Sequence, residues 1–323
     1  MRLSGICRRA CVQRVFAINV EPMKSVTCLA WLLISLCGVA LSQRPRQTVT
    51  SANARTITIN SEPKAVVWID EIRRGVTNDN GLLGSLKLSA GAHNLRVRAM
   101  GFKEMSMPIT AIQRGEIKVR LVRTTDQAEL LFQKAEIARE TARDDPGRQA
   151  SADLYRQALK LKPAYPVAHV GLARILSDLN DPNSALSEIE AARAARPVYA
   201  EASAVEGRIY RETGQTDQAI GAFNRAIREA HGMQPEAHVG IGRVYEDKGQ
   251  YELAAREFKI AIDQLFDTEP IIYQMLGAAY EKSGHNGEAI AAYEDYLRLA
   301  PNGSQASAVK SIVEQLKSQP PND

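Results

Sequence analysis

Gly207–Ala226 reads GRIYRETGQTDQAIGAFNRA, and this stretch decides the fold because two close copies of it follow. They are GRVYEDKGQYELAAREFKIA at Gly242–Ala261 and GAAYEKSGHNGEAIAAYEDY at Gly277–Tyr296, each starting 35 residues after the previous one. A weaker copy begins 34 residues upstream, at Ala173. Self-similarity at this period predicts an all-α solenoid, in which each helix-turn-helix unit buries its apolar face against its neighbours.

Small and aromatic residues recur at fixed offsets in these copies. In the first helix they are the pairs Gly207 and Tyr210, Gly242 and Tyr245, and Gly277 and Tyr280. In the second helix the small residues are Ala219, Ala254 and Ala289. Glycine inside a helix costs about 1 kcal/mol relative to alanine. We therefore expect the second helix, with its equally small alanines, to approach the first closely at these glycines.

A further position marks the end of each first helix. Gly214, Gly249 and Gly284 fall where that helix must stop, as glycine does in a left-handed C-terminal cap. Asn180 takes this place in the weaker copy, since asparagine tolerates a positive φ better than most residues. The turn chemistry therefore supports the same division into two helices per unit.

This spacing resembles the tetratricopeptide repeat, a family whose helix-turn-helix units usually bind other proteins. The resemblance covers about 126–318, as about five repeats and a C-terminal capping helix. The first repeat, 132–165, is degenerate, because its first helix, around 127–143, lacks the glycine and aromatic pair. Its second helix keeps the usual offsets, at Ser151, Tyr155 and Ala158.

The capping helix is expected at Ser304–Ser318. Its apolar residues fall at helical spacing, at Ala308, Ile312, Val313 and Leu316. A helix with one polar face would cover the apolar face of the last repeat. Residues 319–323 form a short tail.

Residues 55–124 predict a small all-β sandwich that precedes the solenoid, because short β-type runs alternate with turn residues. The expected strands are Thr56–Asn60, Ala65–Asp70, His93–Ala99 and Glu116–Val122. We expect Trp68 and Phe102 in its core rather than on a sugar-stacking platform.

The order of motifs from Ser61 to Phe102 resembles the PEGA domain, a family found in bacterial envelope and surface proteins. The residues that carry the resemblance are Ala65-Val66-Val67-Trp68-Ile69-Asp70, Gly75, Leu88-Ser89-Ala90-Gly91 and Gly101-Phe102. Lys64-Ala65 replaces the Glu-Gly that names the family, and Glu71 stands where glycine is common, so the turn there is expected to differ. The resemblance implies a cellular location more than a chemistry.

The N-terminal 42 residues predict an upstream extension followed by a signal peptide, with Met23 as the start. The run Val26–Leu41 holds 16 residues with only two polar interruptions, which is short for a membrane span of about 20. Ala40-Leu41-Ser42 offers a cleavage site before Gln43, and 43–54 reads as a flexible linker. The processed chain would be periplasmic or envelope-associated and would hold none of the four cysteines. A retained N-terminal anchor is the alternative.

Charge divides the remaining chain into two unlike parts. Residues 43–125 hold 14 basic and 6 acidic residues, whereas 126–323 hold 22 and 30. Opposite signs favour docking of one part on the other, or two different partners. The basic part lacks interleaved aromatic residues, so a nucleic-acid partner is not expected.

We find no constellation that indicates catalysis or metal binding. The five histidines are scattered, and neither a zinc-binding H-E-x-x-H motif nor a nucleotide-binding loop occurs. His231 and His238 flank a turn, but two histidines without a third ligand are more often surface residues. We predict that the chain is not an enzyme and holds no cofactor or metal.

Three arginines form the candidate partner-binding site. Arg174, Arg208 and Arg243 each follow the small residue of a first helix, so stacked repeats would align them as an arginine ladder along the groove. Guanidinium groups suit carboxylates and phosphates. The other interpretation is surface pairing four residues along the helix, with Asp178, Glu212 and Asp247.

Together these patterns predict an exported scaffold that binds a protein or peptide partner in the repeat groove, with the β domain positioning or tethering it. Binding of a wall or surface glycan through the basic β domain is the alternative. An enzyme is a third possibility, and it would require a cluster of titratable groups in a pocket.

Overall fold

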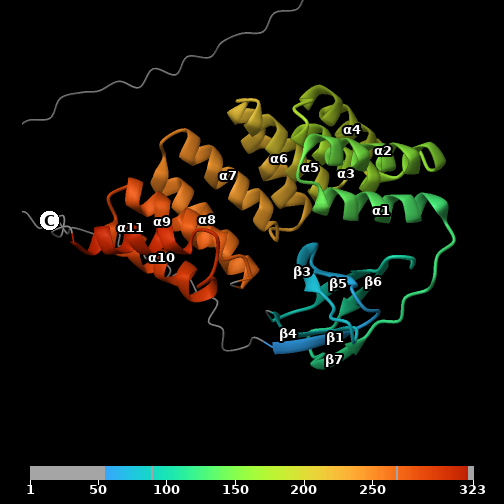
Figure 1. Ribbon diagram of the computed structural model, residues 1–323, viewed down its shortest axis with the longest axis horizontal. Coiled ribbons are helices and arrows are strands. Elements are labelled where there is room, and N and C mark those ends of the chain that lie inside the picture. The colour runs from blue at the N-terminus through green and yellow to red at the C-terminus, as the bar shows by residue number, and fades with distance from the viewer. Residues whose placement is uncertain (1–54, 89, 267, 319–323) are drawn as a thin grey trace, which may run out of the picture. The chain divides into compact units, whose positions relative to one another are not determined.

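The computed structural model describes residues 55–88, 90–266 and 268–318, which lie in one compact unit (Figure 1). The predicted signal peptide, the linker 43–54, the four cysteines and the tail lie outside the described residues. No helix in the described ranges is both long and apolar enough to cross a membrane.

Seven strands in the described part of the chain form two sheets. They are β1 (Arg55–Asn60), β2 (Val66–Ile69), β3 (Ile72–Val76), β4 (Leu82–Leu88), β5 (His93–Arg98), β6 (Met105–Ile109) and β7 (Gly115–Lys118). One sheet has the order β4-β1-β7 and the other β3-β2-β5-β6. All neighbouring strands are antiparallel except β1 and β7, which run parallel with Ile57 opposite Gly115. Alternate residues of the two sheets form one apolar core, including Ile57, Val67 and Leu95.

Four of these strands match the predicted ones, but β3, β4 and β6 were missed. Each contains residues that weaken a strand pattern: two arginines and Gly75 in β3, Gly84 in β4, and Pro108 in β6. Pro108 is tolerated because β6 is an edge strand of its sheet. The predicted strand at 116–122 ends earlier, at Lys118.

The turn between β2 and β3 consists of Asp70 and Glu71, both in the left-handed region with φ of 53° and 63°. These are the central positions of a two-residue hairpin loop, where type I′ turns require a positive φ. Glu71 thus adopts the conformation that glycine would favour. The Asp70 carboxylate holds the turn, since it contacts His93 Nδ1 at 2.5 Å and accepts a hydrogen bond from the backbone N–H of Asn94 at 2.8 Å.

The helical part contains five antiparallel helix pairs and a last single helix within the described residues. The first helices of the pairs are α1 (Gln127–Thr141), α3 (Pro166–Asp178), α5 (Ala200–Glu212), α7 (Pro235–Asp247) and α9 (Ile271–Lys282). The second helices are α2 (Asp145–Leu161), α4 (Pro182–Ala195), α6 (Thr216–Glu229), α8 (Tyr251–Leu265) and α10 (Asn286–Leu299), and α11 (Ala306–Ser318) follows. Successive pairs pack side by side in Figure 1, which confirms the predicted fold class.

The cap positions are as predicted. Gly214, Gly249 and Gly284 have φ between 70° and 81°, and Asn180 has φ of 60°. The Asp181 side chain accepts a hydrogen bond from the Ser184 N–H, so it caps the start of α4.

The glycines inside the first helices face a different partner from the one predicted. A Cβ on Gly207, Gly242 or Gly277 would lie 2.7, 2.4 or 2.6 Å from an aromatic ring of the following helix. These rings belong to Phe223, Phe258 and Tyr293. Close approach of the second helix is therefore correct, but the aromatic rings, rather than the small alanines, require the glycines.

The capping helix is present, with a corrected register. Val313 and Leu316 are buried as predicted, Ile312 is half-buried, and Ala308 is exposed. Ala306 and Val309 fill the buried places instead, in one cluster with Tyr293 and Tyr296 of α10. The reason is geometric: Ala306, Val309, Val313 and Leu316 follow three- and four-residue steps on one helix face.

Candidate protein-interaction site

A cavity of about 480 Å³ lies between the first helices of the repeats and the β domain. Side chains from α1, α3, α5, α7 and α9 line it, and we call this surface the repeat groove. Its apolar lining includes Val167, Val239 and Met275, and its charged lining includes Arg174, Glu236 and Arg243. A mixed lining of this kind suits a peptide, which presents both apolar side chains and charges.

The β2–β3 hairpin closes one side of this cavity. Ile72, the first residue of β3, is only 7% exposed and is buried in an apolar cluster with Phe258, Leu265 and Ile272 of the solenoid. The other buried apolar residues of the β domain form a separate cluster. Ile72 therefore anchors one domain in the other.

Two arginines follow this anchor. Arg73 Nη1 lies 3.1 Å from a Glu140 carboxylate oxygen of α1. Arg74 Nη1 donates a hydrogen bond of 3.1 Å to the backbone carbonyl of Leu265, the last residue of α8. These contacts agree with docking of the basic part on the acidic part, one of the two alternatives that the division of charge left open.

The outer face of the β3-β2-β5-β6 sheet carries Trp68, contrary to the prediction. Trp68 is half-buried and lines the cavity, while Val67 and Ile69 beside it point into the sandwich core. The guanidinium carbons of Arg96 and Arg98 lie 4.3 and 5.1 Å from its ring centroid. Strand alternation puts Trp68 on the outer face. Phe102 packs against the sandwich core, as predicted.

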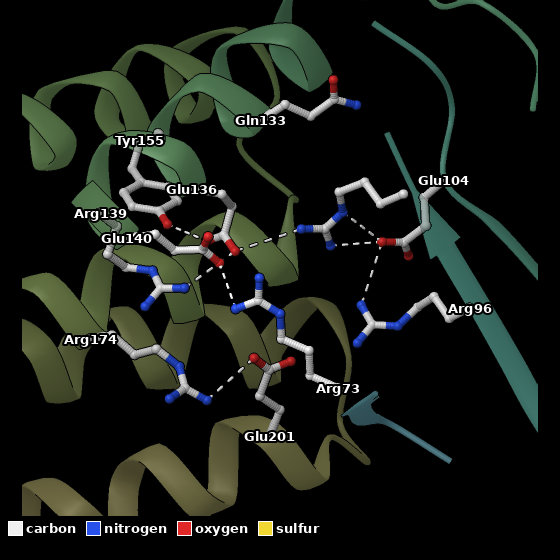
Figure 2. A network of polar contacts seen from close by, with 12 residues as sticks. Arg73, Arg96, Glu104, Gln133, Glu136, Arg139, Glu140, Tyr155, Arg174 and Glu201 are labelled. Atoms are coloured by element: carbon white, nitrogen blue, oxygen red, sulfur yellow. Dashed lines mark hydrogen bonds and ion pairs between the residues drawn. The ribbon is translucent and has the colours of Figure 1, made fainter. Parts of the chain in front are cut away.

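An ionic network continues from this face to α1 (Figure 2). Arg98 donates to Glu104 Oε2 through Nε at 2.8 Å, and its Nη1 lies 3.6 Å from Glu136 Oε2. Arg139 also approaches Glu136, at 3.5 Å, and the Tyr155 hydroxyl donates to the same carboxylate. Figure 2 shows Glu136 at the centre of these contacts.

The network fixes the ionisation of its members. Burial would lower the pKa of Arg98, but Glu104 and Glu136 raise it above its ordinary value. Burial and Glu136 raise the pKa of the Tyr155 hydroxyl. Arg98 thus stays charged and Tyr155 neutral, so these groups hold the β domain and α1 together by charge-assisted hydrogen bonds.

A second contact between the domains consists of hydrogen bonds between uncharged groups. Gln133 of α1 accepts a hydrogen bond from the Gly101 N–H and donates one to the Phe102 carbonyl, both of 2.8 Å. Because Gln133 forms hydrogen bonds with two neighbouring backbone groups, it fixes the orientation of the segment Gly101-Phe102 relative to α1. Sequence reasoning missed this residue and the network, since Arg96 and Arg98 alternate along a strand as solvent-facing residues do.

The three arginines of the ladder lie in different surroundings. Arg174 lines the cavity and contacts Glu236 at 3.1 Å and Glu201 at 3.4 Å. Burial would lower its pKa, but Glu236 and Glu201 raise it above the ordinary value. The pair predicted with Asp178 is replaced, because Arg174 finds carboxylates on later repeats.

Arg208 is held outside the cavity lining. It lies 3.6 Å from Asp178 of the preceding repeat and 3.8 Å from Glu212, which is the pair predicted four residues along. Arg243 is exposed, lines the cavity, and has no ion pair or hydrogen bond to another described residue. The pair predicted with Asp247 is therefore wrong, since Asp247 contacts Arg211 at 3.3 Å.

The histidines do not converge. His238 Nδ1 lies 2.7 Å from Glu257, and His169 contacts both Glu188 and the Pro163 carbonyl. Among the described residues, no three histidine, cysteine or acidic side chains are placed to hold a metal ion.

Comparison with known families agrees with the geometry of the helices. Models of the tetratricopeptide repeat match residues 170–233, 205–270 and 271–302. The helical part is a solenoid of tetratricopeptide repeats. The matches begin at residue 170, after the first helix pair. A search of curated proteins found no match.

Two solved structures share the fold of the helical part. PilW, a type IV pilus biogenesis factor, is 16% identical with a TM-score of 0.50, over 61% of this chain and 93% of PilW. The Cut9–Hcn1 hetero-tetramer of the APC/C is 16% identical with a TM-score of 0.52, over 61% of this chain but only 38% of the matched one. A repeat protein from Thermus thermophilus is 24% identical with a TM-score of 0.49, over 59% of this chain and all of that one.

Proposed function

We propose that this chain is an exported cell-envelope scaffold that binds a protein or peptide partner in its repeat groove. The observation that supports this most is the cavity of about 480 Å³, lined by the first helices of successive repeats with both apolar and charged side chains. The PEGA-like β domain positions the groove, because it is fixed to α1 and to the end of α8 by the contacts above. The proposal gives the chain no catalytic role.

Two members of the arginine ladder, Arg174 and Arg243, line the cavity, and we assign Arg243 to partner contact. It is exposed and lacks an ion pair to any described residue, whereas Arg174 and Arg208 contact carboxylates of the solenoid. A carboxylate of the partner would therefore meet Arg243 without displacing an existing pair. Arg208 and Arg174 then act by keeping the groove in shape.

Crosslinking tests this proposal. The full chain is expressed in its native envelope with a tag, so that the leader can direct export and the tag stays on residues 43–323. The protein is then crosslinked and analysed by mass spectrometry. We expect crosslinks from one partner to residues of α3, α5, α7 and α9, and at least tenfold less captured partner with Arg243→Ala. Arg256→Ala is the matched control, since Arg256 is an exposed arginine of α8 outside the cavity lining. Crosslinks spread evenly over the surface, or equal capture by both variants, would contradict the proposal.

Export is part of the proposal and has its own test. N-terminal sequencing of the envelope fraction is expected to give a protein that begins at or near Gln43. An intact Met1 or Met23 on mature material would overturn the cleavage and favour the retained anchor.

Glycan binding by the β domain gains no support from the site. Trp68, the aromatic residue best suited to a sugar ring, has the guanidinium groups of Arg96 and Arg98 over its ring and lines the groove. A sugar would have to displace these cations.

A further inference from the structure

The tip of the β2–β3 hairpin, Glu71–Arg74, lies in the repeat groove as a bound peptide would. Its Ile72 is buried among solenoid residues and not among those of the sandwich. The burial of Ile72 therefore depends on docking, since the core of the sandwich is complete without it.

Arg74, two residues after this anchor, uses a general feature of helix ends. The last carbonyls of a helix have no partner within the helix and carry partial negative charge. Arg74 donates to one of them, the Leu265 carbonyl of α8, which also accepts a hydrogen bond of 2.8 Å from the Thr268 hydroxyl. The guanidinium carbon of Arg74 lies 5.4 Å from the Phe266 ring centroid. Phe266 stands in the left-handed region, with φ of 52°, at the C-terminal cap of α8. This end of α8 therefore forms a receptor for a cation.

We propose that the groove between α1 and the α8–α9 turn is a binding site for a protein segment in which an apolar residue is followed by two basic residues. The chain's own Ile72-Arg73-Arg74 occupies this site in the isolated protein and stands in for the partner's segment. This inference rests on the proposed function and adds the chemistry of the partner. The partner gains access when its segment displaces the hairpin tip.

The charge of the solenoid supports a basic occupant. Residues 126–323 hold 22 basic and 30 acidic residues, and Glu140 meets Arg73 directly. Glu269, at the other wall of the cavity, adds a further carboxylate near the α8–α9 turn. An acidic partner segment would meet repulsion here, which sets this end of the groove apart from Arg243.

The test uses a fluorescent cyclised peptide of residues 66–76, VVWIDEIRRGV, added to the full chain. The protein variant Ile72→Ser with Arg74→Ser vacates the site and leaves the sandwich core in place. We expect this variant to bind the peptide at least tenfold more tightly than the wild type does. Ile112→Ser with Arg114→Ser is the matched control, because both residues are exposed elsewhere on the β domain. This control should bind as weakly as the wild type.

The peptide itself has a control, in which Ile72 and Arg74 are replaced by serine, and it should bind none of the proteins. Equal binding of the original peptide to wild type and vacated variant, or binding to neither, would overturn the inference. Circular dichroism and thermal melting establish that the variants remain folded.

A second measurement avoids variants of the protein altogether. Hydrogen exchange in residues 72–76 of the wild type should rise as peptide is added, while exchange in β1 stays constant. Unchanged exchange in 72–76 at saturating peptide would contradict displacement. If the native partner still crosslinks to the repeat helices in that case, this inference fails and the proposed function stands.

Discussion

Two helical glycines of the solenoid have opposite surroundings, although both lie inside helices. A Cβ on Gly242 would lie 2.4 Å from the Phe258 ring, whereas a Cβ on Gly221 in α6 would meet no atom within 4 Å. The first glycine is required by packing and the second is not. Helix propensity favours alanine at both sites by about 1 kcal/mol, so the packing term decides the sign of each substitution.

Gly242→Ala should therefore destabilise the chain, because overpacking costs typically about 1–3 kcal/mol and outweighs the gain in propensity. Gly221→Ala should stabilise it by up to about 1 kcal/mol. Urea unfolding of both variants measures the two changes. A Gly242→Ala protein that is as stable as Gly221→Ala would show that the ring of Phe258 moves aside at no cost.

His169 makes the stability depend on pH. Burial would lower its pKa, but hydrogen bonds to Glu188 and to the Pro163 carbonyl raise it above the ordinary value. A pKa raised on folding adds stability that is complete below the unfolded value of about 6.5 and is lost as pH rises through the folded value.

We expect His169→Gln to reduce the melting temperature more at about pH 6 than at about pH 8.5. Glu188→Gln should reduce the same pH dependence, since its carboxylate is the partner of the imidazole. Thermal melts across this range check both variants. A constant difference between wild type and His169→Gln at every pH would rule out the linkage.

Among the elements, the capping helix α11 depends on a register that sequence alone placed incorrectly. Val309 is 1% exposed and faces α10, whereas the neighbouring Ala308 is exposed. Both residues are small and apolar, and alanine is common on exposed helix faces. The predicted register used Ala308 where the structure uses Val309, because the contact with Tyr293 and Tyr296 that buries Val309 is not visible in the local pattern.

Val309→Asp should cost on the order of 3 kcal/mol, because it buries an unpaired charge. Ala308→Asp should change the stability by less than about 0.5 kcal/mol, as surface substitutions usually do. Denaturant unfolding of the two variants provides the comparison. Equal losses of stability would instead favour the register in which Ala308 is buried.

The predictable and unpredictable elements differ in the range of the forces that form them. The helix caps follow from local chemistry, since Gly214 or Asn180 adopts a left-handed conformation by itself, and the repeat period exposes them in the sequence. Strand β3 does not follow from local chemistry, because its arginines contact Glu140 of α1 and the Leu265 carbonyl of α8, which are far away in the sequence. From the sequence alone, such a strand is predicted as a charged loop.

At the scale of the whole molecule, the candidate site was predicted only in part, because several of its contacts join distant parts of the chain. The groove and two of its arginines follow from the repeat spacing. Docking of the β domain brings Trp68, Arg98 and Glu136 together from distant positions in the chain, and no local pattern announces that contact. The opposite charge of the two parts was the available signal. It indicated that the two parts could attract each other, but not which residues would come into contact.

The parallel pairing of β1 with β7 has a mechanical consequence when the β domain is pulled from its two ends. Tension between the start of β1 and the end of β7 runs along both strands in opposite directions. The hydrogen bonds from Ile57–Gly115 to Asn60–Lys118 then share the load in shear and must break together. Pulling between Arg55 and Leu88, which are opposed in the antiparallel pair β1–β4, would instead unzip that pair one bond at a time.

In force spectroscopy we expect a clearly higher rupture force for Arg55 and Lys118 as attachment points than for Arg55 and Leu88. Equal forces would show that this sheet yields elsewhere. The expected order would make the β domain a mechanical clamp, which keeps its shape while the chain is pulled from both sides of it.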